Sequence, residues 1–247
     1  MIASLAAGEL AYCFAVLLFS YSLRGSSGFG SAIGMPLLAL VIPVKVLAPA
    51  WTLLGVASSI AILGRDRNQV AIREFGSIAP WCAVGVAGGL YFFAALDSQT
   101  LARALGLFIL IYAAHSFWLT FTPSTNQRAS RLLRPASGLL SGAVGTMFGA
   151  MASVFFAMYL SESRLAKRAF RATMSAMLLA LSLIRAAGYA AVDQLGFDAL
   201  AVFLAALPAM ALGIYLGDRI HAKIDETRFR RLICLALGLC AFALLLQ

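Results

Sequence analysis

The feature that most constrains the fold is a series of long apolar windows with almost no charged residues. They cover residues 10–23, 25–44, 46–64, 76–96, 104–122, 135–160, 172–192, 199–217 and 232–246. A helix needs about 20 apolar residues to cross a bilayer. The windows lack the alternation of polar and apolar positions found in membrane β-barrels, and a helix pairs its backbone groups within one segment. The sequence therefore predicts an all-α integral membrane protein.

Composition supports this prediction and narrows the partners. The 247-residue chain is 62% hydrophobic and 12% charged, whereas an average soluble domain is about 25% charged. A net charge of +9 would indicate nucleic acid in a soluble protein, but in a membrane protein it indicates basic cytoplasmic loops. We therefore expect the lipid bilayer, and no nucleic acid, as a partner.

The connections between windows sort by charge. Most cations lie in residues 65–74, 121–134, 161–171 and 218–231, whereas 97–100 and 193–198 carry only acids. Because basic loops stay on the cytoplasmic side, these four loops are expected there, with both chain termini opposite. The expected location is a bacterial inner (plasma) membrane, with the chain crossing it several times.

Two windows are rich in glycine, at residues 25–36 and 137–149, and straight helices are not expected there. The window 135–160 lies between two basic loops, so it must enter and leave on one side, yet it is too short for two crossings of about 20 residues each. We predict a broken or re-entrant helical hairpin. Residues 10–44 are its expected counterpart from the opposite side, folding back near Arg24.

The chain also resembles itself at a shift close to half its length. A shift of 128 residues (208 − 80) pairs Pro80 with Pro208, Gly85 with Gly213, and Gly89 with Gly217. Loop charge gives the two halves opposite orientations. We therefore predict two inverted-topology repeats, residues 1–121 and 122–247, forming one transmembrane domain. This architecture is typical of secondary transporters, whose substrate lies where interrupted helices meet near the midplane.

The glycine-rich segments supply the candidate substrate-binding residues. A buried oxyanion needs backbone N–H groups, hydroxyls or cations as donors, and no Asp or Glu lies inside these windows except Glu9 at an edge. The hydroxyls could instead bond back to helix carbonyls, and the glycines could serve close helix packing. The candidates are Ser27, Gly28, Gly30, Ser31, Gly142, Gly145, Thr146 and Gly149.

One cation lies well inside an apolar window. Arg185 follows Ala172 by thirteen residues and precedes Asp193 by eight, and a charge near the bilayer centre costs about 2.5–3.5 kcal/mol on insertion scales. Its side chain either contacts the anion or extends to the headgroups. Lys167 and Arg171 are expected to form a cytoplasmic vestibule that concentrates anions.

These segments together resemble the TauE/SafE family of membrane transporters, the sulfite exporters. The resemblance rests on Gly28-Phe-Gly30 with Pro36-Leu-Leu, on Gly142-x-x-Gly-Thr-Met-Phe-Gly149, and on Lys167-x-x-Phe-Arg-Ala-Thr173 followed by Arg185 and Tyr189. Two departures are Ser153, where a Gly-Pro pair is common, and Ser31-Ala32, where some members have consecutive glycines. The resemblance implies a secondary transporter for a small anion, sulfite or an organosulfonate such as sulfoacetate.

Other function classes fit the sequence less well. An enzyme is not expected, because the chain has only His115 and His221 as histidines and no HExxH or GxSxG motif. Four cysteines lie in apolar segments without a CxxC pair, so no metal site and no cofactor are predicted. An anion channel and a non-transporting membrane assembly subunit remain alternatives. A homodimer suits a carrier of this size, although no sequence feature indicates one.

Overall fold

The computed structural model describes residues 6–27, 31–119, 133–163, 165–219, 238 and 240–244, and its elements are helices. The all-α class is thus confirmed. Four of these helices are long and apolar enough to cross a membrane, so the chain is a multi-pass membrane protein. The elements are α1 (Ala7–Ser27), α2 (Ser31–Ala39), α3 (Val44–Asp66), the 3₁₀ turn η2 (Arg67–Gln69), α4 (Ile72–Ala95), α5 (Ser98–Leu119), α6 (Leu133–Phe148), α7 (Ala152–Glu162), α8 (Lys167–Ala191) and α9 (Phe197–Arg219).

The first glycine-rich segment, residues 25–36, includes the end of α1 and most of α2, and these two helices run antiparallel. The Tyr12 hydroxyl donates to the Leu37 carbonyl over 3.1 Å, and Gly34 packs against Ser20. The expected fold-back near Arg24 comes a few residues later, because α1 continues through Arg24 to Ser27 and α2 begins at Ser31. The side chain of Arg24 bonds to α3 instead of marking a turn.

The second glycine-rich segment breaks later than expected. Straight helix was not expected over residues 137–149, yet α6 is continuous to Phe148. The break falls at Gly149 and Met151, whose φ angles are +76° and +71°. Helical glycine is unfavourable by roughly 1 kcal/mol, and packing of the α6 glycines on a neighbouring helix compensates for this.

Beyond the break, α7 returns to the end of the molecule where α6 began. The Tyr159 hydroxyl of α7 donates to the Glu74 carboxylate, in the first turn of α4, and Tyr159 also contacts Ser77 at 2.7 Å. Gly138, near the start of α6, lies beside Ile78 of α4. Both outer ends of the α6–α7 segment therefore lie beside the first turns of α4.

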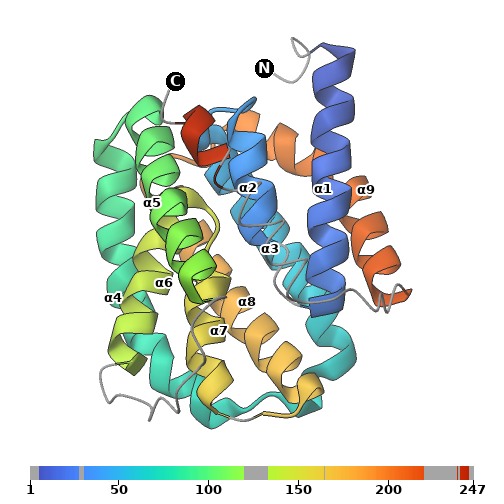
Figure 1. Cartoon of the computed structure of the whole chain (residues 1–247), viewed down its shortest axis with the longest axis vertical. Helices are drawn as coiled ribbons and strands as arrows, with labels where there is room; N and C mark the ends of the chain where they lie inside the picture. The colour runs from blue at the N-terminus through green and yellow to red at the C-terminus, as the bar shows by residue number, and fades with distance from the viewer. Residues whose placement is uncertain are drawn as a thin grey trace.

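Two helix pairs flank a central pair (Figure 1). In that view α4 and α6 lie on the left, α1 and α9 on the right, and α3 and α8 pack together between them. Glycines let the outer pairs approach closely: a Cβ on Gly89 would lie 2.7 Å from the Ala143 oxygen of α6, and one on Gly213 would lie 2.8 Å from the Leu18 oxygen of α1. Small residues at such contacts are typical of membrane helices.

The helix contacts recur in two sets. α1 contacts α2 and α9, and in the same way α6 contacts α7 and α4. Likewise α3 contacts α2 and α9, and α8 contacts α7 and α4. In Figure 1 the start of α1 and the short helical segment at 240–244 lie at the same end of the molecule. α3 and α8 thus occupy equivalent places in the two sets of contacts.

Candidate functional site

Arg185 is buried in the interior of α8 and is 3% exposed. Its Nη2 donates to the Thr52 hydroxyl of α3 over 2.5 Å. Its Nε is buried without a hydrogen-bond partner. Among the described residues no carboxylate pairs with Arg185, and its neighbouring ionisable group is Tyr189. The side chain therefore does not extend to the protein surface, and it presents an unused donor inside the molecule.

Thr52 fixes the orientation of this guanidinium. Its hydroxyl donates to the Ala48 carbonyl over 2.9 Å, which leaves the oxygen lone pairs free to accept from Arg185. Thr52 is 1% exposed, so the contact lies between α3 and α8 and away from lipid. The pair joins residues 133 positions apart in the chain.

The broken end of α6 lies next to Arg185. A Cβ built on Gly145 would be 3.8 Å from Nη1 of Arg185 and 3.0 Å from the Cβ of Ala152. One on Gly149 would be 2.9 Å from the Cα of Ala48 in α3. The break thus lies against α3, and Gly145, which has no side chain, lies beside the Arg185 guanidinium of α8.

Tyr189, one turn after Arg185, ties α8 to the end of α6. Its hydroxyl donates to the Thr146 carbonyl, and its ring centroid lies 6.0 Å from the Arg185 guanidinium carbon. The Thr146 hydroxyl donates to the Gly142 carbonyl over 2.6 Å, which is the back-bonding that competes with ligand binding. Thr146 therefore positions the break through its backbone.

Small and hydroxyl residues line the contact between α3 and α8. A Cβ on Gly55 would lie 2.7 Å from the Ser182 oxygen, so the backbone of α3 comes close to α8 here. Both helices also carry further buried polar residues. The buried polar residues of the two helices are Thr52, Ser58 and Ser59 on α3, and Thr173, Ser175, Ser182 and Arg185 on α8.

The chemistry of this arrangement favours an anion. A guanidinium carries a permanent positive charge and only donors, and burying it without a counter-ion is unfavourable by several kcal/mol. A small oxyanion placed at Nε would offset that charge and satisfy the unused donor. Within the described residues, no cluster of His, Cys, Asp and Glu could hold a metal ion.

The structure separates the residues that the sequence grouped. Gly145, Gly149 and Arg185 lie together, whereas a Cβ on Gly142 would point at α4, 2.8 Å from the Val86 nitrogen. Arg171 donates to the Gly25 carbonyl of α1 over 3.2 Å. Ser27 ends α1, Ser31 begins α2 and Lys167 begins α8, but their side chains lie outside the described structure, as do Gly28 and Gly30 entirely.

Sequence reasoning did not single out Thr52. A threonine inside an apolar window is common, because its hydroxyl can bond to the helix carbonyl four residues earlier, as Thr52 does. The one signal available was position, since Thr52, Gly55 and Ser59 repeat at three- and four-residue spacing and so share a helix face. That spacing marks the polar face of α3.

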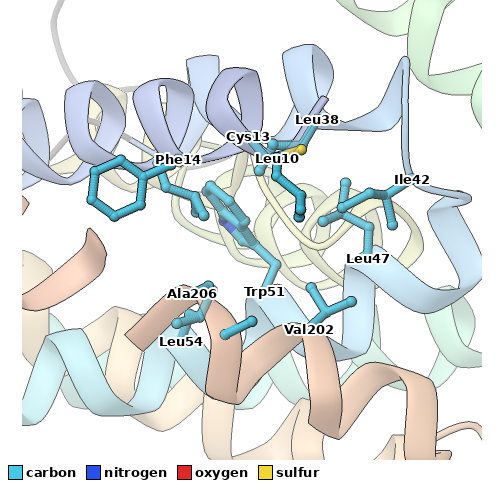
Figure 2. Close-up of a pocket in the computed structure, with 12 residues that line it drawn as sticks. Leu10, Cys13, Phe14, Leu38, Ile42, Leu47, Trp51, Leu54, Val202 and Ala206 are labelled. Carbon is cyan, nitrogen blue, oxygen red and sulfur yellow. The ribbon is translucent and has the colours of Figure 1, made fainter. Parts of the chain in front are cut away.

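A separate apolar pocket of about 220 Å³ lies among α1, α2, α3 and α9 (Figure 2). Trp51 and Phe14 project into it, and no charged side chain lines it. No positively charged side chain is therefore present in this pocket to bind an anion. The full lining is Leu10, Cys13, Phe14, Leu17, Leu38, Ile42, Leu47, Trp51, Leu54, Val202, Ala205 and Ala206.

A family model described as sulfite exporter TauE/SafE matches residues 13–244, nearly the whole chain. No match was found among curated proteins or among solved structures. The matched range includes α3, the α6–α7 break and Arg185.

Proposed function

Because the chain belongs to the TauE/SafE family of sulfite exporters, a family of membrane permeases, we propose that it is a secondary transporter of a small sulfur oxyanion. The substrate proposed is sulfite or an organosulfonate such as sulfoacetate, moved across a bacterial inner membrane. The observation that carries this proposal is Arg185: a buried guanidinium with an unused donor, next to a helix break.

The proposed site contains Arg185 as the charge that binds the anion and Gly145 as the residue that leaves room for it. The α6–α7 break, from Gly149 to Met151, forms one wall, and Thr52 orients the guanidinium. Ser27, Gly28, Gly30 and Ser31, between α1 and α2, are proposed as the opposing wall. Arg171 and Lys167 would attract anions toward it from the cytoplasmic end.

Alternating access is the proposed mechanism, and the paired helix contacts support it. The contacts of α1, α2 and α3 recur as those of α6, α7 and α8, as expected if residues 1–121 and 122–247 are inverted repeats. The two broken segments would then be re-entrant from opposite sides, and movement of one half against the other would open the site to each side in turn.

Flux into liposomes tests the proposal. The purified chain should take up radiolabelled sulfite with saturable kinetics, and unlabelled sulfite or sulfoacetate should compete better than chloride. Gly145→Leu should remove uptake because the new side chain occupies the anion space, whereas Gly88→Leu should retain it because nothing lies within 4 Å of a Cβ at Gly88. Unsaturable, very fast flux would indicate a channel, and no flux would indicate an assembly subunit.

A further inference from the structure

A second buried arginine lies on α1, away from Arg185. Arg24 is 4% exposed, and its Nη2 donates to the Ser59 hydroxyl of α3 over 2.8 Å. Its Nε is buried without a hydrogen-bond partner. No carboxylate in the described part of the chain pairs with it, and its ionisable neighbour is Tyr21. Arg24 therefore repeats the arrangement of Arg185 on the other half of the chain.

Tyr21 adds a second unused donor at the same place. Its side chain is 1% exposed, and its hydroxyl is buried without a partner. Tyr21 and Arg24 are three residues apart on α1, a spacing that places side chains on neighbouring positions of one helix face. A phenol and a guanidinium that both lack acceptors are together suited to a ligand with several acceptor oxygens.

Both guanidiniums bond to one face of α3. Thr52 holds Arg185 and Ser59 holds Arg24, and seven residues are nearly two full helical turns, or about 10 Å along the axis. Gly55 lies between them and brings the backbone of α3 close to Ser182 of α8. Two positive charges without carboxylate partners thus follow each other along the polar face of the central helix.

We infer that Tyr21, Arg24 and Ser59 form a second binding site for a small oxyanion, distinct from the site at Arg185. The inference rests on the proposed function, since it makes this site a second station on the same path. A sulfite or sulfonate group has three oxygens, enough to accept from the Arg24 Nε–H and the Tyr21 hydroxyl at once.

Arg171 links this second site to the basic start of α8. Its Nη1 donates to the carbonyl of Gly25, the residue that follows Arg24, and loop charge predicts that this end of α8 is cytoplasmic. An anion attracted by the basic segment 161–171 would reach Arg24 before Arg185. Two successive weak sites let an anion enter the path and leave it again, as in other ion pathways.

A purely structural role for Arg24 makes a different prediction. If Arg24 only ties α1 to α3 through Ser59, the Tyr21 hydroxyl has no use, and Tyr21→Phe should leave anion binding unchanged. If the site binds an anion, Tyr21→Phe removes one donor to it while keeping the aromatic ring. This variant loses a single oxygen, so it tests the inference even where Arg24→Gln fails to fold.

Trp51 provides the readout, because its ring centroid lies 5.6 Å from that of Tyr21. In the full chain with Trp81→Phe and Trp118→Phe, sodium sulfite titrated at constant ionic strength should change Trp51 fluorescence saturably. Tyr21→Phe and Arg24→Lys should each weaken the apparent affinity about tenfold, the effect of one hydrogen bond to a charged group. Tyr12→Phe is the matched control on α1, since its hydroxyl is already bonded to Leu37, and it should change nothing.

The outcomes separate the two proposals. An unchanged sulfite affinity in Tyr21→Phe, or no Trp51 response in a chain that transports sulfite, would overturn the second site and leave the transport function standing. A Trp51 response that Tyr21→Phe weakens would support the site. If that result came with normal sulfite transport by Arg185→Gln, the role proposed for Arg185 would fail while the second site remained.

Discussion

Gly142 and Gly145 are three residues apart on α6 but have different neighbours. A Cβ on Gly142 would lie 2.8 Å from the backbone nitrogen of Val86 in α4, which cannot move aside. One on Gly145 would meet side chains only: Ala152 at 3.0 Å, Leu181 at 3.4 Å and Arg185 at 3.8 Å. One glycine-rich motif thus has two environments, since Gly142 packs against backbone atoms of α4, whereas Gly145 lies among side chains that include the buried Arg185.

The contact between α1 and α9 extends the comparison to the other outer helix pair. A Cβ on Gly213 would lie 2.8 Å from the Leu18 oxygen, and one on Gly25 would lie 2.9 Å from the Ile214 oxygen. These glycines resemble Gly142 in meeting backbone atoms. Glycine at the outer helix pairs is therefore a packing residue.

The largest loss of stability is expected for the variant Gly142→Ala. The new methyl would meet backbone atoms of α4, and overpacking of this kind destabilises by about 1–3 kcal/mol or more. The melting temperature in detergent should fall by several degrees. Gly88→Ala is the matched control on α4, where nothing lies within 4 Å of the Cβ, and it should melt at least as high as wild type. Equal melting temperatures for wild type and Gly142→Ala would show that Gly142 is not needed for the packing of α6 on α4.

A smaller loss of stability is expected for Gly149→Ala. Its φ of +76° lies in the left-handed region, where a non-glycine residue costs about 1–2 kcal/mol. The added methyl would also approach the Cα of Ala48 at 2.9 Å. Thermal unfolding should show a lower midpoint, and transport should fall because the break is the wall of the proposed site. If Gly149→Ala were as stable and as active as wild type, the claim that a side chain is strained at this position would be wrong.

Gly145→Ala should separate stability from transport. The Ala152 methyl at 3.0 Å must shift by a few tenths of an ångström, but alanine is favoured over glycine in a helix by roughly 1 kcal/mol, so the melting temperature should stay within a few degrees of wild type. The Michaelis constant for sulfite should rise several-fold, since the methyl narrows the space beside Arg185. A fall in melting temperature as large as that of Gly142→Ala would make Gly145 a packing residue too.

The smallest effect on stability is expected for Thr100→Ala, which changes the surroundings of Asp97 before α5, far from both glycines. The Thr100 hydroxyl and the backbone N–H groups of Thr100 and Gln99 donate to this carboxylate, and they lower its pKa from the usual value. Since the folded pKa is depressed, the contribution to stability is present above the unfolded pKa and is lost as the pH falls through the folded pKa. In Thr100→Ala the Asp97 pKa should rise, as measured by carbon NMR of the labelled carboxyl.

The sequence predicts the fold class because hydropathy is a local property. The apolar windows 46–64, 76–96 and 199–217 correspond closely to α3, α4 and α9. The charge of Arg185 inside such a window also identified it as a candidate. These features required no knowledge of which helices touch.

Features that depend on distant partners could not be predicted. The fold-back was predicted near Arg24, but Arg24 is a buried residue of α1 that bonds to Ser59, 35 residues away. Gly142 and Gly145 share one motif, and only the position of α4 on one side and α8 on the other distinguishes them. The location of the break at Gly149 depends likewise on the close approach of Ala48.

The most direct test of anion binding at Arg185 is sulfite transport by two variants in liposomes, with Arg103→Gln, an exposed cation on α5, as the control. Arg185→Lys keeps the charge but loses the Nε–H and the planar fork, so the Michaelis constant should rise about tenfold. Arg185→Gln should lose saturable uptake while remaining folded, and Arg103→Gln should behave as wild type. Transport by Arg185→Gln with an unchanged Michaelis constant would show that this buried guanidinium does not bind the transported anion.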